Sequence, residues 1–315
     1  MSTKDTVTKY FMRDKATFAD VFNFLIYDGK SIINPEALRE LDSAVVVVPY
    51  SKDGKPIPKQ MARDLLKLMT IMEDGEAIYV ALGIENQSQI HYAMPVRIMF
   101  YDAAYYVSQV EKTSAKHRTD SDKPETNAEI LSGFYRTDKL IPVVTVVYYF
   151  GSDSWTAPRS LYDMFPVVNE ALRKFIPNYP INLIAPAELT DDEIKMFATD
   201  LRRVTQCLKY ANDPKKFDEI TRADPAYRHI SRRAADVINV VTNSNLKFPE
   251  NEEEVDMCLA IEEIKKESEV RGEAKGEAKG IFKILHTLVE KGLLSIEDAA
   301  KNAGVSVEEF QRSKP

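Results

Sequence analysis

The sequence predicts an α/β protein: a mixed β-sheet flanked by helices, with an additional helical region and a helical C-terminal tail. One observation is that strand-like apolar runs alternate with segments of helical periodicity, in the order helix, strand, hairpin, helix, strand. A second is the segment 141–150, which is apolar at both alternating sets of positions, as expected of an interior strand. Together they favour a sheet with helices on both faces.

The first elements follow from apolar spacing. Residues 5–27 carry large apolar side chains at helical intervals, which predicts one helix. The β-branched run 44–48 ends at a proline and predicts a buried strand, and 51–59 is a loop rich in Lys, Gly and Pro. Runs 65–72 and 77–84 are joined through Asp-Gly, which is typical of a hairpin. We therefore expect the sheet to begin with three antiparallel strands.

The later elements are predicted in the same way. Residues 94–111 have a helical pattern, and 112–128 are polar and predict a mobile loop. A further strand is expected at 181–185. Residues 191–210 predict a helix whose N-cap is Thr190.

The C-terminal region differs in character. Residues 252–280 are charged and helical, and contain the repeat Gly-Glu-Ala-Lys-Gly-Glu-Ala-Lys-Gly, whose glycines either allow close helix approach or form a hinge. A helix at 281–291 ends at a glycine, and two shorter helices follow. These resemble a helix-turn-helix, but zero net charge favours an interaction or dimerisation module equally. We expect a core, a helical extension with a basic stretch, a charged linker and a small helical module at residues 1–190, 191–250, 251–280 and 281–315.

The net charge of −7, from 42 Lys and Arg against 49 Asp and Glu, at first weighs against a nucleic-acid partner. Residues 250–280 contain eleven acids and five bases, so most of this charge belongs to one segment. The rest is nearly neutral, and 201–235 holds nine bases against four acids. Such a stretch either follows a phosphate backbone or is a solvated helix face.

Several classes of protein are excluded by residue usage. Cys207 and Cys258 cannot form a disulfide framework or a cysteine-rich zinc site, which favours a cytoplasmic protein. No apolar leader and no apolar run of about twenty residues is present, so neither a secretory signal nor a membrane span is expected. The four histidines are scattered along the chain, so no zinc cluster is expected. The sequence contains no glycine-rich phosphate-binding loop, so no nucleotide cofactor is expected either.

Two acids have positions that suit a metal. Asp64 opens the first strand of the predicted hairpin, and Glu85 lies at the end of the second. Acids on adjacent strands can point to one side and share a hard cation, for which Mg²⁺ is the first choice and Mn²⁺ or Ca²⁺ the alternatives. More commonly, however, a carboxylate at the end of a strand is simply exposed to solvent and binds no metal.

The segment 78–102 closely resembles the Glu-x-Gln-Ser…Met-x-x-Arg-x-x-x-Tyr signature of the Rpn family. These are recombination-promoting nucleases, also described as YhgA-like transposases, in the PD-(D/E)XK superfamily. Residues 18–24 resemble the N-terminal helix of the family, 140–161 its later strand and loop, and 272–300 its tail. The resemblance spans nearly the whole chain and implies a restriction-endonuclease-like sheet.

The resemblance implies a set of site residues. The first superfamily acid corresponds to Asp64 and the second to Glu85, and the backbone carbonyl of Asn86 would be a third metal ligand. The superfamily lysine corresponds to Gln87, which departs from the superfamily pattern although glutamine is usual in this family. Glutamine can orient the attacking water but supplies no charge.

Two further residues are implied as accessories. Asp20 could add an acid from the first helix, or could be an exposed helix residue. Arg97 could contact a phosphate, or could form a structural ion pair with a site acid or with Asp102.

The resulting hypothesis is a Mg²⁺-dependent DNA endonuclease, linked to recombination or mobile elements, that uses Asp64, Glu85 and Gln87. The alternative is a catalytically weak or silent family member that binds DNA or protein and forms a homo-oligomer through its C-terminal tail.

Overall fold

The computed structural model describes residues 3–41, 44–47, 59–62, 64–73, 76–120, 123–167, 169–249 and 251–312. The chain divides into two compact units. Unit 1 comprises residues 1–245 and 249–255, and unit 2 comprises residues 246–248 and 256–315. Each is described by itself.

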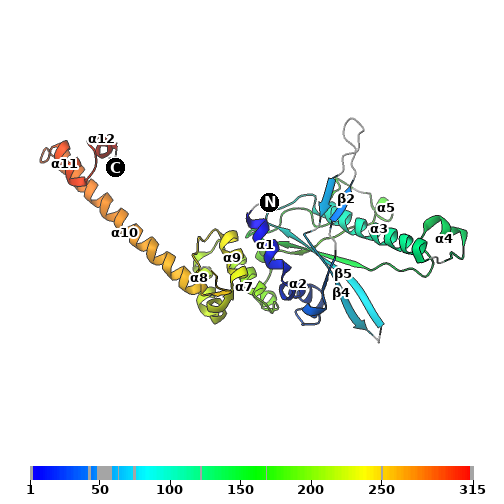
Figure 1. The fold of residues 1–315 in the computed structure, drawn as a ribbon. Helices are drawn as coiled ribbons and strands as arrows, with labels where there is room; N and C mark the ends of the chain where they lie inside the picture. The colour runs from blue at the N-terminus through cyan, green and yellow to red at the C-terminus, as the bar shows by residue number, and fades with distance from the viewer. Residues whose placement is uncertain are drawn as a thin grey trace. The chain divides into compact units, whose positions relative to one another are not determined.

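Unit 1 is built on a five-stranded sheet in the order β1-β4-β5-β6-β7 (Figure 1). Its strands are β1 (Arg39–Glu40), β4 (Leu65–Glu73), β5 (Glu76–Gln87), β6 (Val143–Tyr149) and β7 (Asn182–Ile184). β4 is antiparallel to β1 and β5, whereas β5, β6 and β7 are parallel. The parallel step from β5 to β6 needs a crossover, which α3 (Met94–Asp120) forms. The mixed sheet, the hairpin and the later strands are confirmed; the Asp-Gly turn itself lies outside the described residues.

The strand predicted at 44–48 is present but is not part of this sheet. β2 (Ala44–Val47) pairs with β3 (Lys59–Ala62) in a separate two-stranded sheet. The strand next to β4 at this edge is β1, which pairs at Lys67 and Leu68, whereas β2 forms its ladder with β3. The expected three-stranded antiparallel start therefore holds, but β1 supplies its first strand. Most of the predicted 51–59 loop lies outside the described residues.

The helix predicted at 5–27 is two helices, α1 (Thr3–Arg13) and α2 (Lys15–Tyr27). The break is at Asp14, whose carboxylate accepts a hydrogen bond of 2.9 Å from the backbone N–H of Thr17. Aspartate at an N-cap satisfies a backbone donor that has no partner inside the helix. Apolar periodicity continues across such a break, which is why the pattern alone does not locate it.

The mobile loop predicted at 112–128 is wrong. α3 continues to Asp120, and α4 (Asn127–Ser132) follows. Tertiary contacts hold this polar stretch in place: Gln109 exchanges two hydrogen bonds with the backbone of Ile141, and His117 lies 2.9 Å from Asp138. The polar composition of this stretch correctly indicated that it is largely exposed to solvent. An exposed stretch can still be helical, as this one is up to Asp120.

The helix predicted at 191–210 is also divided, into α6 (Asp191–Lys195) and α7 (Leu201–Lys209). Its N-cap Thr190 is confirmed, because its side chain accepts from the N–H of Glu193. Other elements of unit 1 are α5 (Glu170–Arg173), α8 (Pro214–Ala223), α9 (Arg232–Thr242), β8 (Ile230–Ser231), β9 (Glu254–Val255) and the 3-10 turns η1 (Pro35–Ala37), η2 (Tyr162–Met164), η3 (Pro186–Glu188) and η4 (Pro225–His229).

Helices cover both faces of the sheet, as predicted. Val147 and Tyr149 of β6 pack in one cluster with Met94 and Ile98 of α3. Tyr148 lies between them in sequence and points the other way, where its hydroxyl is 2.6 Å from Thr205 of α7. The core of unit 1 therefore has a layer on each side of β6.

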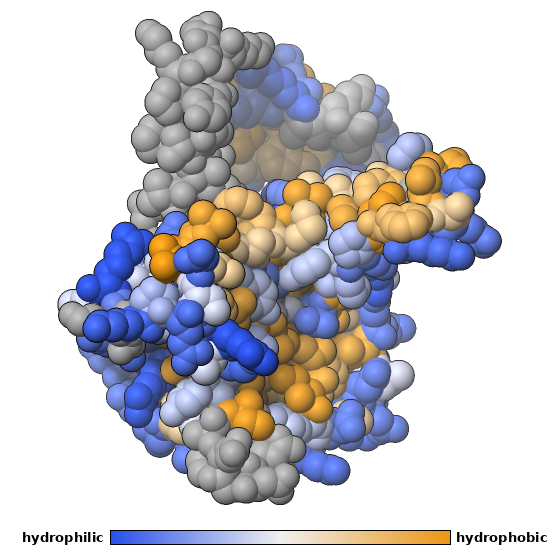
Figure 2. All heavy atoms as spheres, turned by 90° about the vertical axis from the view of Figure 1, so that its right-hand side faces the viewer, coloured by the Kyte–Doolittle hydropathy of each residue, from blue (hydrophilic) through white to orange (hydrophobic). Residues whose placement is uncertain are grey.

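Not every apolar side chain is taken into this core. Figure 2 shows hydrophobic and hydrophilic patches side by side on one face. The exposed apolar side chains of unit 1 include Leu131 of α4 and two near α5, Val167 and Phe175, which are 91%, 90% and 83% exposed.

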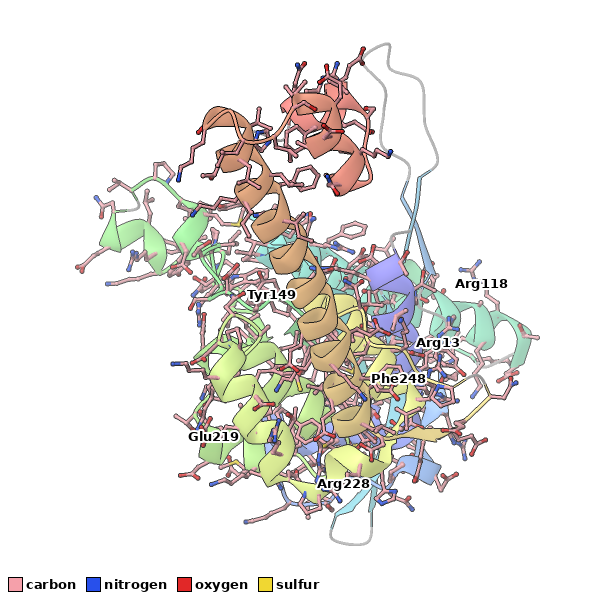
Figure 3. All side chains as sticks on the ribbon, turned by 90° about the vertical axis from the view of Figure 1, so that its left-hand side faces the viewer. Arg13, Arg118, Tyr149, Glu219, Arg228 and Phe248 are labelled. Atoms are coloured by element: carbon pink, nitrogen blue, oxygen red, sulfur yellow. The ribbon has the colours of Figure 1, made fainter. Side chains whose placement is uncertain are left out.

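Unit 2 consists of α10 (Met257–Glu290), α11 (Ile296–Ala303) and α12 (Val307–Arg312). Figure 3 shows α10 as one continuous helix, with α11 and α12 folded against its C-terminal end. Phe310 of α12 is fully buried there and stacks on His286 of α10. The predicted tail helices are confirmed, and α10 continues through the glycine repeat. No described helix of the chain is long and apolar enough to cross a membrane.

Candidate active site

The hairpin brings Asp64 and Glu85 together. Leu65 of β4 pairs with Ile84 of β5, so Asp64, immediately before β4, lies opposite Glu85. The N–H of Asp64 donates to Oε1 of Glu85 at 3.3 Å, and the N–H of Asn86 donates to Oδ2 of Asp64 at 2.9 Å. Backbone and side chains are therefore joined in one hydrogen-bonded group at the strand ends.

Arg97 of α3 joins this group from one face of the sheet. Its Nη2 lies 3.0 Å from Oε2 of Glu85, whose side chain is fully buried. Burial alone would lower the pKa of Arg97, but the charge of Glu85 and the hydrogen bond to Tyr101 raise that pKa above its ordinary value. Burial and the charge of Glu85 likewise raise the pKa of Tyr101, so both groups stay protonated.

Helix α1 supplies two residues that the sequence did not single out. Nζ of Lys9 lies 3.5 Å from Oδ1 of Asp64, and Oγ of Ser88 donates to Oδ1 of Asp5 at 2.9 Å. Asp5 and Lys9 are four residues apart and so share one face of the helix. The four-residue spacing is the one sequence feature that could have linked Asp5 with Lys9. It does not show which part of the chain their face of α1 contacts.

A cavity of about 320 Å³ opens at this group. It is lined by Asp5, Asp64, Asn86, Gln87, Ser88, Gln89, Ile90, His91 and Arg97. The side-chain amide of Asn86 is buried, and neither its oxygen nor its nitrogen has a hydrogen-bond partner among the residues that the structure describes. Buried polar atoms are usually hydrogen-bonded, so an unpaired amide in a cavity wall indicates a place for a polar ligand.

The donor set suits a hard cation. Asp64 lines the cavity with its carboxylate, and Asn86 adds a backbone carbonyl. Glu85 is fully buried and is not among the lining residues, and its two oxygens contact the N–H of Asp64 and the guanidinium of Arg97. Within the described part of the chain, no three His, Cys, Asp or Glu side chains form a metal-binding cluster. Mg²⁺ commonly uses only one or two carboxylates together with waters, so a two-carboxylate site fits it better than it fits zinc.

The structure does not bring Asp20 to this group. Its Oδ1 accepts from the N–H of Ala198, and its Oδ2 accepts from the N–H and hydroxyl of Thr199. The predicted residues Asp64, Glu85, Asn86, Gln87 and Arg97 do come together.

The basic stretch at 201–235 is largely neutralised within the fold. All of its residues are described, and six of its nine bases form ion pairs: Arg203, Lys209, Lys216, Arg222, Arg232 and Arg233. This distribution favours the solvated, internally paired surface over a continuous phosphate-binding strip.

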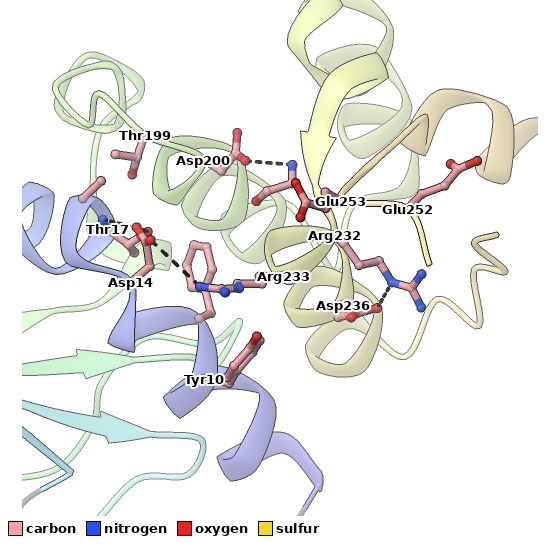
Figure 4. A pocket seen from close by; sticks show the side chains of 13 residues that line it. Tyr10, Asp14, Thr17, Thr199, Asp200, Arg232, Arg233, Asp236, Glu252 and Glu253 are labelled. Carbon is pink, nitrogen blue, oxygen red and sulfur yellow. Dashed lines mark hydrogen bonds and ion pairs between the residues drawn. The ribbon is translucent and has the colours of Figure 1, made fainter. Parts of the chain in front are cut away.

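A second cavity, of about 580 Å³, lies between α1, the start of α2 and the start of α9 (Figure 4). Five of its charged side chains take part in hydrogen bonds or ion pairs of the fold. Asp14 caps α2 and pairs with Arg233, Asp200 accepts from the N–H of Ser231, and Arg232 pairs with Asp236. Asp64 and Glu85 are not among its lining residues.

Comparison with known families matches residues 58–225, which is more than half of the chain. The matching family is described as "Putative transposase, YhgA-like", and the matched segment includes Asp64, Glu85 and Arg97. Searches of curated proteins and of solved structures find no match. The chain therefore belongs to the YhgA-like transposase family, also called the Rpn family.

Proposed function

We propose that this protein is a metal-dependent DNA endonuclease that hydrolyses phosphodiester bonds in a recombination or mobile-element context. The observation that carries the proposal is the hydrogen-bonded pair of Asp64 and Glu85 at adjacent strand ends, beside a polar cavity. Membership of a transposase family supports DNA as the substrate.

The order of elements around the pair supports a PD-(D/E)XK arrangement. An antiparallel hairpin, β4 and β5, carries the acids, and a crossover helix leads to the parallel strand β6. Both acids lie at one end of the hairpin, where Arg97 of α3 contacts Glu85 and Lys9 of α1 contacts Asp64. The restriction-endonuclease-like fold is therefore part of the proposal.

The residues have separate roles in the proposed reaction. Asp64, Glu85 and the carbonyl of Asn86 would hold Mg²⁺, or alternatively Mn²⁺ or Ca²⁺. Such a cation lowers the pKa of bound water and balances charge on the phosphate. Gln87, which lines the cavity, would orient the water through its side-chain amide. Arg97 compensates the buried charge of Glu85 and keeps that carboxylate in place.

A plasmid-nicking assay with Mg²⁺ or Mn²⁺ tests the proposal. The intact chain is expected to nick or cut the plasmid and to stop when the metal is chelated. Asp64→Asn and Glu85→Gln should each lower the cleavage rate at least about 100-fold, because each removes a metal-binding charge with little change of shape.

The matched control is Asp218→Asn, which removes a carboxylate from an exposed ion pair with Arg222. It should cleave at the wild-type rate. Equal activity of wild type, Asp64→Asn and Glu85→Gln would contradict the assignment, and absence of metal-dependent cleavage by the wild type would contradict the function.

The second candidate is a weak or silent family member that acts by binding. Two observations favour it: Gln87 brings no charge to the site, and Ile281 and Ile284 on α10 are 51% and 62% exposed. Exposed apolar side chains on one helix indicate a contact surface, here for a second copy of the chain. This candidate predicts concentration-dependent self-association without metal-dependent cleavage.

A further inference from the structure

Lys9 is held beside Asp64 by the position of α1. The ion pair joins Nζ of Lys9 and Oδ1 of Asp64 at 3.5 Å, and both side chains are 21% exposed. One turn earlier, Asp5 accepts a hydrogen bond from Ser88, which directly follows β5. These two contacts anchor the same face of α1 to the end of the hairpin, so the ammonium group stays close to the cavity.

Among the residues that the structure describes, Lys9 and Arg97 contact the acid pair, and they differ in how readily each could move its charge to a ligand. Arg97 lies 3.0 Å from the fully buried Glu85, and withdrawing it would weaken the compensation of a carboxylate in a low-dielectric environment. Lys9 pairs at a longer distance with Asp64, which retains contact with solvent. Its charge can therefore be shared with a ligand at lower cost.

The chemistry of a lysine side chain also suits it to contact a phosphate. Its ammonium group is a compact charge on a flexible four-carbon stem, and it binds phosphate as a point charge. An ammonium within ion-pair distance of Asp64 is within reach of a phosphate placed against the same carboxylate. The end of β5 lacks such a charge, because Gln87 is neutral.

We infer that Lys9 is a catalytic residue that contacts the scissile phosphate and supplies, from α1, the positive charge that Gln87 cannot. The inference rests on the proposed nuclease function. In the reaction, water adds to phosphorus, the bond from phosphorus to the leaving oxygen breaks, and the proton lost by water is balanced by the one that the leaving oxygen gains. Negative charge grows on the phosphate oxygens as the attack proceeds, and Lys9 stabilises that growing charge.

Single-turnover cleavage by the full chain is the first test. Lys9→Met is expected to lower kcat about 100-fold to 1000-fold, with KM changed only a few-fold, since the contact strengthens in the transition state. Lys9→Met combined with Gln87→Lys should recover at least about tenfold of that loss, because the charge returns from the neighbouring strand. The matched control, Lys15→Met, removes an exposed lysine paired with Glu36 and should leave kcat unchanged.

A binding measurement tests the same contact without cleavage. In the Asp64→Asn background, duplex affinity is measured by fluorescence anisotropy over a range of salt concentrations without added metal. Adding Lys9→Met should lower the slope of log affinity against log salt by about one, the effect of one lost phosphate contact, whereas adding Lys15→Met should not. A lysine that only balances Asp64 would leave this slope unchanged.

The outcomes separate the two proposals. If wild type cleaves, Asp64→Asn is inactive and Lys9→Met keeps kcat within threefold, the inference about Lys9 is wrong and the nuclease function stands. If wild type shows no metal-dependent cleavage, the function fails and the role of Lys9 fails with it. Circular dichroism checks folding, and should Lys9→Met not fold, Lys9→Gln, which keeps a polar side chain, is expected to show the same loss of kcat.

Discussion

At the residue scale, Asp20 shows how surroundings decide what a carboxylate does. It is 3% exposed, and both oxygens accept hydrogen bonds from the segment that precedes α7. Those bonds hold the segment between α6 and α7, so one side chain of α2 stabilises the break in the helix predicted at 191–210. Asp64 has a similar chemistry but borders a cavity and retains solvent contact.

Replacing Asp20 with Asn should destabilise the protein without affecting cleavage. The amide keeps one acceptor oxygen and loses the other, so an N–H of the 198–199 segment loses its charged acceptor, at about 1–3 kcal/mol of unfolding free energy. Urea denaturation measures the loss, with the exposed Asp192→Asn as a control expected within about 0.5 kcal/mol of wild type. A variant of normal stability that no longer cleaves would instead return Asp20 to the active site.

At the scale of elements, polar contacts decide where helices end and how they meet. Asp14 divides α1 from α2, and Gln109 fixes α3 to the chain entering β6. Asp191, the first residue of α6, accepts hydrogen bonds from Lys209 and Tyr210 at the end of α7, at 2.7 and 2.6 Å. These bonds hold the pKa of Asp191 below its ordinary value.

Lys209→Met should therefore lower stability in a pH-dependent way. Because the pKa of Asp191 is lower in the folded state, its contribution is present above the ordinary aspartate pKa of about 4 and is lost as the pH falls through the folded-state value. The side chain of Asp191 is half exposed, so the expected deficit at pH 7 is only about 0.5–1 kcal/mol. Urea denaturation at pH 7 and pH 3 should show it shrinking at the lower pH.

The exposed pair Lys195–Asp192 provides the comparison, and Lys195→Met should change stability by less than about 0.5 kcal/mol at both pH values. An equal deficit for Lys209→Met at both pH values would assign its effect to packing of the lysine stem on the Tyr210 ring rather than to charge.

At the scale of the whole molecule, the proposed site and the C-terminal module belong to different compact units. Asp64, Glu85, Arg97 and Lys9 all belong to unit 1. Unit 2 has its own small core around Phe310 and exposed apolar side chains on α10. This division accommodates both proposals, cleavage in one unit and self-association through the other.

A chain ending at Val255, with Leu246 and Phe248 changed to Ser, should retain metal-dependent cleavage within about twofold, because every residue of the candidate site is kept. It should also lose concentration-dependent self-association. Plasmid nicking and sedimentation velocity measure the two properties. A folded truncated chain that does not cleave would show that unit 2 takes part in catalysis.

The sequence by itself determined the mixed α/β class, the hairpin with its two acids, the tail helices and the family. These depend on patterns within a few residues or on a motif carried by one continuous segment, and both can be read without coordinates. The tertiary structure alone decided that β1 borders β4, that Asp20 binds the segment between α6 and α7, and that Lys9 faces Asp64. Each of those contacts joins residues far apart in the chain, where local periodicity carries no information about partners. The net charge of −7, which at first weighed against a nucleic-acid partner, is likewise a sum over the whole chain. The tertiary structure shows which charged side chains form ion pairs.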